Sequence, residues 1–155
     1  MPSKRSAGIL LYRVHSGTPQ VLLAHPGGPF WANKDDGAWT VPKGEIGDDE
    51  DPLAAARREF REEIGAEPCG DFIALSPVRQ RSGKMVQAWA VRGDLDPSRL
   101  ESNSFSMEWP PRSGRQQEFP EVDRAGWFTF AQARAKILPA QVPLLDQLER
   151  ILEEE

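Results

Sequence analysis

The residues best suited to chemistry lie in one acidic segment, GEIGDDEDPLAAARREFREEIGA, which runs from Gly44 to Ala66. Asp51 is a good N-cap, Pro52 suits the first helical position, and Gly65 lies where a glycine commonly ends a helix. The residues between them are strong helix formers and include no glycine. The segment therefore predicts a helix from about Pro52 to Ile64.

Three glutamates share one face of this expected helix. At about 100° per residue, Glu62 falls about 60° to one side of Glu59, and Glu63 falls about 40° to the other. Phe60 and Ile64 lie on a second, apolar face that must pack on a core. A solvated acidic face is the competing interpretation, but like charges at these spacings repel, and the last turn of a helix disfavours negative charge. Clustered carboxylates instead suit a hard divalent cation, Mg²⁺ or Mn²⁺.

The same segment resembles the Nudix box, G-x5-E-x7-R-E-U-x-E-E-x-G-U, in which U is a bulky aliphatic residue. Two residues depart from the pattern, Phe60 and Ala66, and both occupy packing positions. The fixed charged residues and glycines all match: Gly44, Glu50, Arg58, Glu59, Glu62, Glu63 and Gly65. The resemblance implies the Nudix fold, an α/β/α sandwich on a mixed β-sheet.

The resemblance also implies a reaction: hydrolysis of a nucleoside diphosphate linked to another moiety, with water attacking phosphorus and Mg²⁺ assisting. Metal ions neutralise the charge of a pyrophosphate and lower the pKa of bound water. The implied metal ligands are the carbonyl of Gly44 and the carboxylates of Glu59, Glu62 and Glu63. Arg58 is implied to orient these carboxylates.

The general base has two possible positions. Some Nudix enzymes use the glutamate that matches Glu59, and others use a distal acid from a loop. Here the distal candidates lie in a long polar stretch before Trp127. They are Glu108, Glu118 and Glu121.

Candidate substrate contacts lie outside the helix. The W-T-V-P-K-G form, with Lys43 before Gly44, resembles dinucleoside-polyphosphate and diphosphoinositol-polyphosphate hydrolases. Lys43 can bind an extra phosphate as a point charge, as can Arg81 in an expected turn. His25 and Trp31 belong to a Gly/Pro-rich loop over His25–Gly37, where the histidine can contact phosphate and the indole can stack on a nucleobase. The competing interpretations are solvated charges and aromatic caps on a core.

Three functions are compatible with the pattern. The first is a Mg²⁺-dependent pyrophosphohydrolase of a nucleoside or dinucleoside polyphosphate, such as a diadenosine polyphosphate. The second is the same chemistry on damaged NTPs, nucleotide sugars, capped RNA or inositol pyrophosphates. The third is a catalytically silent nucleotide sensor, which is disfavoured because such proteins typically lose box glutamates and this chain keeps them all.

The whole chain is consistent with one domain over residues 1–155. Its net charge of −5 and pI of about 5.2 argue against general nucleic-acid or membrane-surface binding. The single cysteine excludes an internal disulfide and favours a reducing cytoplasm. The sequence does not specify an oligomeric state.

Periodicity and turn residues predict an α+β order of elements. A capping box at Thr129 and Gln132 predicts a helix through about Ile137, and Pro143 opens a last amphipathic helix. The expected strands are Ala7–Val14, Val21–Ala24, Trp39–Val41, and a hairpin of Phe72–Arg79 with Met85–Val91.

Overall fold

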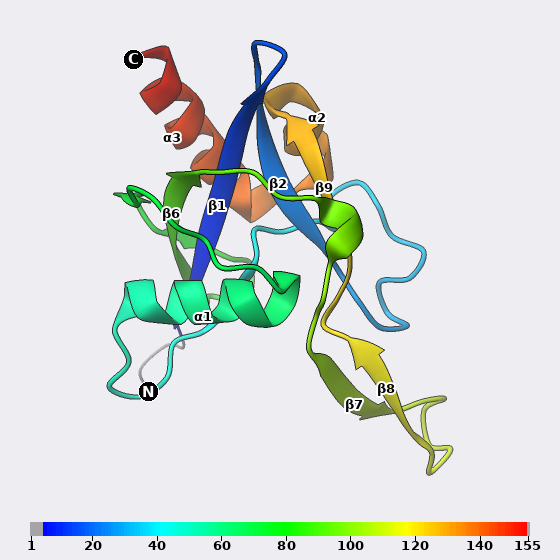
Figure 1. The fold of residues 1–155 in the computed structure, drawn as a ribbon. Coiled ribbons are helices and arrows are strands. Elements are labelled where there is room, and N and C mark those ends of the chain that lie inside the picture. The colour runs from blue at the N-terminus through cyan, green and yellow to red at the C-terminus, as the bar shows by residue number, and fades with distance from the viewer. Residues whose placement is uncertain (1–4, 155) are drawn as a thin grey trace.

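The computed structural model describes residues 5–154, which form a mixed sheet with helices on both faces (Figure 1). The seven strands of this sheet follow the order β4–β6–β1–β2–β9, with β3 paired to β1 and β5 paired to β6. The β1–β6 pair is parallel and the other pairs are antiparallel. The strands are β1 (Arg5–His15), β2 (Thr18–Pro26), β3 (Lys43–Glu45), β4 (Ile73–Ala74), β5 (Val78–Arg79), β6 (Met85–Arg92) and β9 (Val122–Thr129).

The remaining elements are three α-helices, a separate hairpin and two short 3-10 turns. The helices are α1 (Pro52–Ile64), α2 (Phe130–Lys136) and α3 (Val142–Glu153). The hairpin consists of β7 (Ser104–Glu108) and β8 (Gln116–Pro120), and the 3-10 turns are Pro97–Arg99 and Pro139–Gln141. Within residues 5–154, every helix is too short or too polar to cross a bilayer.

The central strand β1 divides the core into two layers, because successive side chains of a strand point to opposite faces. Ile9 and Leu11 lie in one buried cluster with Phe60 of α1. Leu10 lies in the other cluster with Leu144 of α3 and with residues of α2. The prediction of an α/β/α sandwich is therefore confirmed.

Helix α1 has the bounds that its capping residues predict. The Asp51 carboxylate accepts a hydrogen bond from the Ala54 N–H at 3.0 Å, and Gly65 ends the helix at φ 85°. Ala56 and Phe60 are fully buried against the sheet. The acidic residues of α1 lie on its other faces, where Glu59 and Glu63 meet the backbone of β3.

One expected strand is displaced along the chain. Trp39–Val41 contributes only isolated bridges, from Trp39 to Ile137 and from Thr40 to Ala24. Regular pairing with β1 begins at Lys43, which lies opposite Gly8. The prediction of a strand at Trp39–Val41 is wrong in position, because Pro42 has no N–H and contributes only its carbonyl, which accepts from Ile9 at 3.1 Å.

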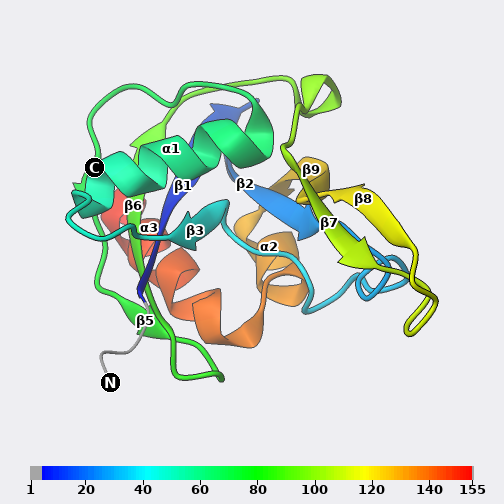
Figure 2. The ribbon, with the colours of Figure 1, turned by 90° about the horizontal axis from the view of Figure 1, so that it is seen from below.

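The polar stretch before Trp127 is a β-hairpin that projects from the sandwich (Figures 1 and 2). Phe105 of β7 lies opposite Phe119 of β8, with ring centroids 6.0 Å apart. Phe105 also packs on Gly28, where an added Cβ would lie 3.0 Å from the ring. The alternation of Phe105, Met107 and Trp109 with polar residues is the sequence signal for this strand.

The other expected elements are present. β4 and β5 both pair with β6, as the predicted hairpin requires, although each contains only two residues. The capping box forms at α2, since the Thr129 hydroxyl accepts from the Gln132 N–H and the Gln132 side chain accepts from the Thr129 N–H. α3 buries Leu144, Leu145 and Leu148.

The cap of α1 can be tested by Asp51→Ala. Losing the carboxylate leaves a helix N–H without its partner, so we expect a loss of about 1 kcal/mol in the free energy of unfolding. Urea denaturation measures this change. Asp48→Ala is the matched control, since Asp48 is exposed and precedes the helix. Equal midpoints for the two variants would contradict the assignment of the cap.

Candidate functional site

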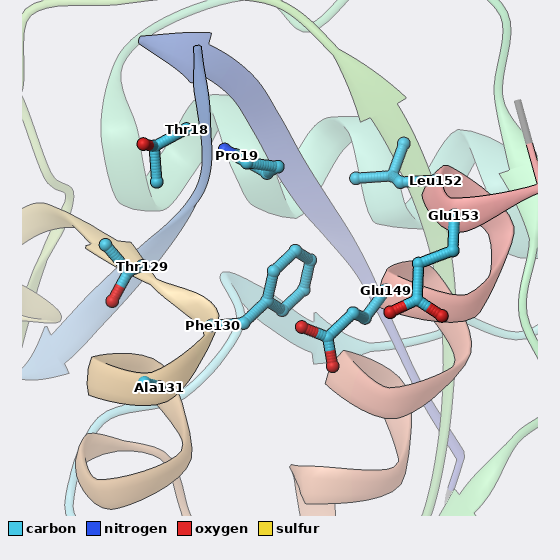
Figure 3. Close-up of a pocket in the computed structure, with 8 residues that line it drawn as sticks. All are labelled: Thr18, Pro19, Thr129, Phe130, Ala131, Glu149, Leu152 and Glu153. Carbon is cyan, nitrogen blue, oxygen red and sulfur yellow. The ribbon is translucent and has the colours of Figure 1, made fainter. Parts of the chain in front are cut away.

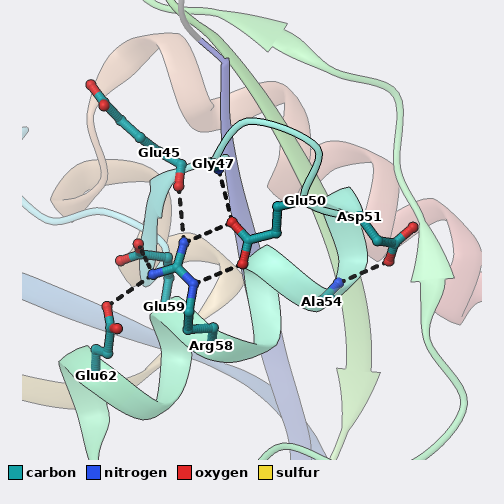
Figure 4. Close-up of polar contacts among 8 residues, drawn as sticks. All are labelled: Glu45, Gly47, Glu50, Asp51, Ala54, Arg58, Glu59 and Glu62. Carbon is teal, nitrogen blue, oxygen red and sulfur yellow. Dashed lines mark hydrogen bonds and ion pairs between the residues drawn. The ribbon is translucent and has the colours of Figure 1, made fainter.

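Arg58 holds the box carboxylates together (Figure 4). Its Nε and Nη2 donate to the two oxygens of Glu50 at 2.8 and 3.0 Å, a bidentate pair. Its Nη1 donates to Glu59 at 2.7 Å and to Glu62 at 3.1 Å, and its Nη2 also reaches the carbonyl of Glu45 at 3.2 Å. One guanidinium thus connects three carboxylates, and its hydrogen bonds lower the pKa of Glu50 to about 2.

Glu59 is packed against the backbone of Gly44. A Cβ added to Gly44 would lie 2.0 Å from Cδ of Glu59, so only glycine leaves room for this carboxylate. The Glu59 side chain is 12% exposed. Burial raises its pKa, against the opposing effect of Arg58. The strand β3 and the helix α1 therefore bring the Gly44 backbone and the Glu59 carboxylate into contact.

Glu63 lies deeper, one turn along the same face. One of its carboxylate oxygens accepts from the Lys43 N–H at 3.1 Å. Burial raises the pKa of Glu63 to about 8, and the nearby charges of Glu59 and Glu121 act in the same direction. Burial also lowers the pKa of Lys43, while Glu63 attracts its charge. Lys43 thus lies beside the carboxylates, and its role in phosphate binding stays a prediction.

Of the three distal acids, the structure brings only Glu121 to the box carboxylates. Burial raises the pKa of Glu121, and repulsion from Glu59 and Glu62 adds to the effect. The Glu121 N–H donates to the carbonyl of Asn103 at 2.8 Å, and the Asn103 N–H donates to the carbonyl of Glu62 at 2.7 Å. Asn103 was not singled out from the sequence, because its role depends on its backbone. The other two candidates, Glu108 and Glu118, lie on the hairpin, where the Glu108 carboxylate accepts from the Arg112 N–H at 2.7 Å.

The other candidate substrate contacts are spread over the molecule. His25 belongs to β2 and is fully buried, with Nδ1 2.8 Å from Asp123 and Nε2 2.6 Å from the carbonyl of Lys34. Both ring nitrogens have internal partners, so this position disagrees with the expected phosphate contact. Trp31 is partly exposed in the loop after β2, where Lys34 Nζ lies 5.0 Å from its ring. Arg81 is exposed in the turn between β5 and β6.

A cavity of about 340 Å³ lies at another part of the molecule (Figure 3). It is bounded by the start of β2, the junction of β9 with α2, and the end of α3. Phe130 and Leu152 supply apolar walls, and Glu149 and Glu153 supply carboxylates. No residue of the acidic segment lines it. The chemistry therefore favours the acidic face of α1 as the candidate site.

The residues of this site fit a divalent cation by their chemistry. Glu59, Glu63 and Glu121 are partly or largely buried carboxylates whose pKa values are raised first by burial and then by repulsion from neighbouring carboxylates, and a bound cation would offset both effects. Within residues 5–154, no three acidic, histidine or cysteine side chains already converge as a metal site. The reason is that Glu59 and Glu62 turn toward Arg58, while Glu63 accepts from the Lys43 N–H.

The arrangement agrees with the comparison against known families. A family model described as the NUDIX domain matches residues 2–148. The chain belongs to the NUDIX family. The prediction from the acidic segment is thus confirmed.

Several known proteins resemble this chain, one in part of its sequence and others in the whole fold. An RNA pyrophosphohydrolase of Gluconacetobacter diazotrophicus is 36% identical over 73 residues, which cover 43% of this chain and 40% of that protein. An Ap4A hydrolase of C. elegans has a TM-score of 0.69 at 20% identity, covering 97% of this chain and 99% of that one. The NUDIX domain of Shewanella oneidensis NrtR, in complex with ADP ribose, has a TM-score of 0.68 at 16% identity, covering 98% and 90%. The two structural matches confirm the fold.

The buried Glu63 carboxyl predicts a pH-dependent stability. Its pKa is about 8 in the folded protein against an ordinary value of 4.5. Between these values the folded state retains a proton that the unfolded state has released, so the stability of the metal-free protein falls as pH rises from about 4.5 to about 8. We expect Glu63→Gln to remove much of this decline, as measured by urea midpoints at about pH 5 and about pH 8. The exposed Glu118→Gln should retain it, and an unchanged decline in Glu63→Gln would contradict the burial argument.

The contact between Gly44 and Glu59 predicts the effect of a single methyl group. Gly44→Ala should destabilise the protein by about 1 kcal/mol, because the new Cβ overlaps the Glu59 carboxyl, which must move and lose its hydrogen bond to Arg58. Thermal unfolding measures the loss. Gly126→Ala is the control, because a Cβ there would meet only Phe128 at 3.4 Å or more. Similar melting temperatures for the two variants would show that α1 does not press on β3 as described.

Proposed function

We propose that the protein is a Mg²⁺-dependent pyrophosphohydrolase that cleaves a phosphoanhydride bond in a nucleoside or dinucleoside polyphosphate. One observation carries the proposal, namely that four carboxylates lie near one another where α1 meets β3. Glu59 packs on Gly44 and shares Arg58 with Glu62. Glu63 accepts from the Lys43 N–H, and Glu121 lies close enough to be repelled by Glu59 and Glu62. Carboxylate and carbonyl oxygens are the ligands that Mg²⁺ prefers, and Mn²⁺ can replace it.

The side chains would divide the work by position. Glu59, Glu62 and Glu63, with the Gly44 carbonyl, would hold the cation, which supplies charge neutralisation at phosphorus and a more acidic water when bound. Arg58 is a positioning residue, because its bidentate pair with Glu50 fixes the guanidinium that orients Glu59 and Glu62.

The proton acceptor for the attacking water is then one of two carboxylates. Glu59 is the candidate on the helix and Glu121 is the distal candidate. Each is partly buried and has a raised pKa, which brings a carboxylate closer to the working range of a general base. Lys43, beside Glu63, can compensate the charge of a substrate phosphate.

The substrate class rests on shared chemistry among similar proteins. The relatives named above are an RNA pyrophosphohydrolase, an Ap4A hydrolase and a NUDIX domain bound to ADP ribose, whose ligands all join nucleosides to linked phosphates. The W-T-V-P-K-G form around Lys43 favours the dinucleoside polyphosphates among them. The single cysteine is consistent with work in a reducing cytoplasm.

A second candidate is supported by one observation. The sequence match to the RNA pyrophosphohydrolase is the stronger one in identity, at 36% against 20% for the Ap4A hydrolase. The 5′ end of a triphosphorylated RNA contains the same kind of phosphoanhydride bond, which the carboxylates of this site could also act on. A substrate panel must therefore include it beside diadenosine polyphosphates, canonical and oxidised NTPs, ADP-ribose, nucleotide sugars and inositol pyrophosphates.

The carboxylates can be tested one at a time. With Mg²⁺ and the preferred substrate, Glu62→Gln and Glu63→Gln should each lower kcat by at least about 100-fold, because a lost metal ligand costs no less than a lost supporting partner. Glu121→Gln should lower kcat and change its pH profile if Glu121 accepts the proton, whereas Glu59→Gln should do so if Glu59 does.

Glu118→Gln is the matched control, because Glu118 lies on the exposed hairpin and was an equally good distal candidate in the sequence. Its kcat should equal that of the wild type. Wild-type rates in both Glu62→Gln and Glu63→Gln would refute the metal-site assignment. Tight nucleotide binding without turnover in the wild type would instead favour a non-catalytic sensor.

A further inference from the structure

Two segments leave the sandwich at the carboxylate corner. The β7–β8 hairpin begins after Asn103 and ends before Glu121, and its ends are tied to the Glu62 carbonyl through Asn103. The loop of residues 27–37 begins at the same place, because the Gly27 N–H donates to the Glu121 carbonyl at 2.9 Å. The hairpin and this loop lie side by side in both ribbon views (Figures 1 and 2).

The two segments meet again through an aromatic pair. Phe30 of the loop and Trp109 of the hairpin lie edge to face, with ring centroids 5.5 Å apart. Phe30 is 61% exposed, and Trp109 is partly exposed. An exposed aromatic pair adds little to the core of a domain, but it offers a flat apolar surface to a planar ligand.

Both partners of the pair are held in place. On the hairpin, the Trp109 N–H donates to the Arg115 carbonyl at 2.9 Å, and the Gln117 side chain donates to the Trp109 carbonyl at 2.7 Å. On the loop, the buried His25 ring binds the Lys34 carbonyl. Trp39 Nε1 donates to Asp35 at 2.8 Å, which fixes the far end of the loop. The backbone at Trp109 and the far end of the loop that carries Phe30 are therefore held in place, which lowers the entropic cost of binding.

Three basic side chains lie on the same loop and hairpin as the pair, together with the acidic residues Asp35, Asp36, Glu108 and Glu118. Lys34, Arg112 and Arg115 are exposed, and within residues 5–154 none of the three forms an ion pair. Aromatic faces next to cations are the combination that binds nucleobases with their phosphates.

We propose that Phe30 and Trp109 form a nucleobase clamp for the end of the substrate that lies away from the cleaved bond. The clamp rests on the proposed function, since the carboxylates would act on one part of the polyphosphate while the base at its other end stacks here. Trp109 directly follows β7 and is five steps of about 3.3 Å from Ser104, so the clamp lies roughly 16 Å from the base of the hairpin. That separation favours a long substrate, a dinucleoside polyphosphate, over a mononucleotide.

The clamp can be tested with diadenosine tetraphosphate as substrate and inorganic tripolyphosphate, which has no base, as competitor. Phe30→Ala and Trp109→Ala should each raise KM for diadenosine tetraphosphate on the order of tenfold, the usual effect of losing one stacking contact. Both variants should keep the wild-type kcat and the wild-type inhibition constant for tripolyphosphate. Trp109→Phe, which keeps an aromatic face, should restore most of the lost affinity.

Val14→Ala is the matched control, because Val14 is the other large apolar side chain exposed within residues 5–154 and belongs to β1. Unchanged KM in both Phe30→Ala and Trp109→Ala, with active wild type, would overturn the clamp and leave the proposed function standing. If the wild type has no turnover, calorimetry with diadenosine tetraphosphate tests the clamp independently of the hydrolase activity. Binding lost in the two variants would uphold the clamp and refute the hydrolase, and no binding to the wild type would overturn both.

Discussion

Four glutamate carboxylates confined to one corner are the constraint on which the site depends. Within residues 5–154, the cations beside Glu59, Glu62, Glu63 and Glu121 are the guanidinium of Arg58 and the half-buried ammonium of Lys43. Burial, with repulsion among the carboxylates as a smaller cause, raises the pKa values of Glu59, Glu63 and Glu121, so these groups hold protons more tightly. A divalent cation would also offset this cost, so we expect protons and metal to compete for this corner.

The fold brings these carboxylates together through apolar packing of α1 on the sheet, and not through attraction among the carboxylates themselves. The apolar face of α1, with Phe60 and Ile64, is fixed on the sheet, so the acidic face cannot rotate into solvent. Gly44 then lets the Glu59 carboxylate lie against β3 at a distance that any side chain would forbid. The hydrophobic free energy of the sandwich thus outweighs the repulsion among like charges. Repulsion among these carboxylates lowers the free energy of unfolding, as is common at functional sites.

Local signals in the sequence predicted α1 and its carboxylates well, because Asp51, Pro52 and Gly65 act on neighbouring residues. The sequence could not show which distal acid lies at the site, because Glu108, Glu118 and Glu121 all belong to one polar stretch. Their distances from α1 depend on the paths of β8 and β9 through the fold. The position of Glu121 depends on the pairing of β9 with β2, a contact between residues about 100 positions apart. His25 was misplaced for a related reason: β2 continues to Pro26, past the expected end at Ala24, and turns the ring into the core.

We infer that the corner of four carboxylates binds a divalent cation in exchange for a proton. Titration of the metal-free protein with Mn²⁺ at about pH 7, followed by electron paramagnetic resonance and by calorimetry in two buffers of different ionisation enthalpy, tests it most directly. The account predicts saturable binding with proton release, and loss of both when Glu59, Glu62 and Glu63 are all replaced by Gln. Saturable binding that survives the triple replacement, or no binding by the wild type, would contradict it.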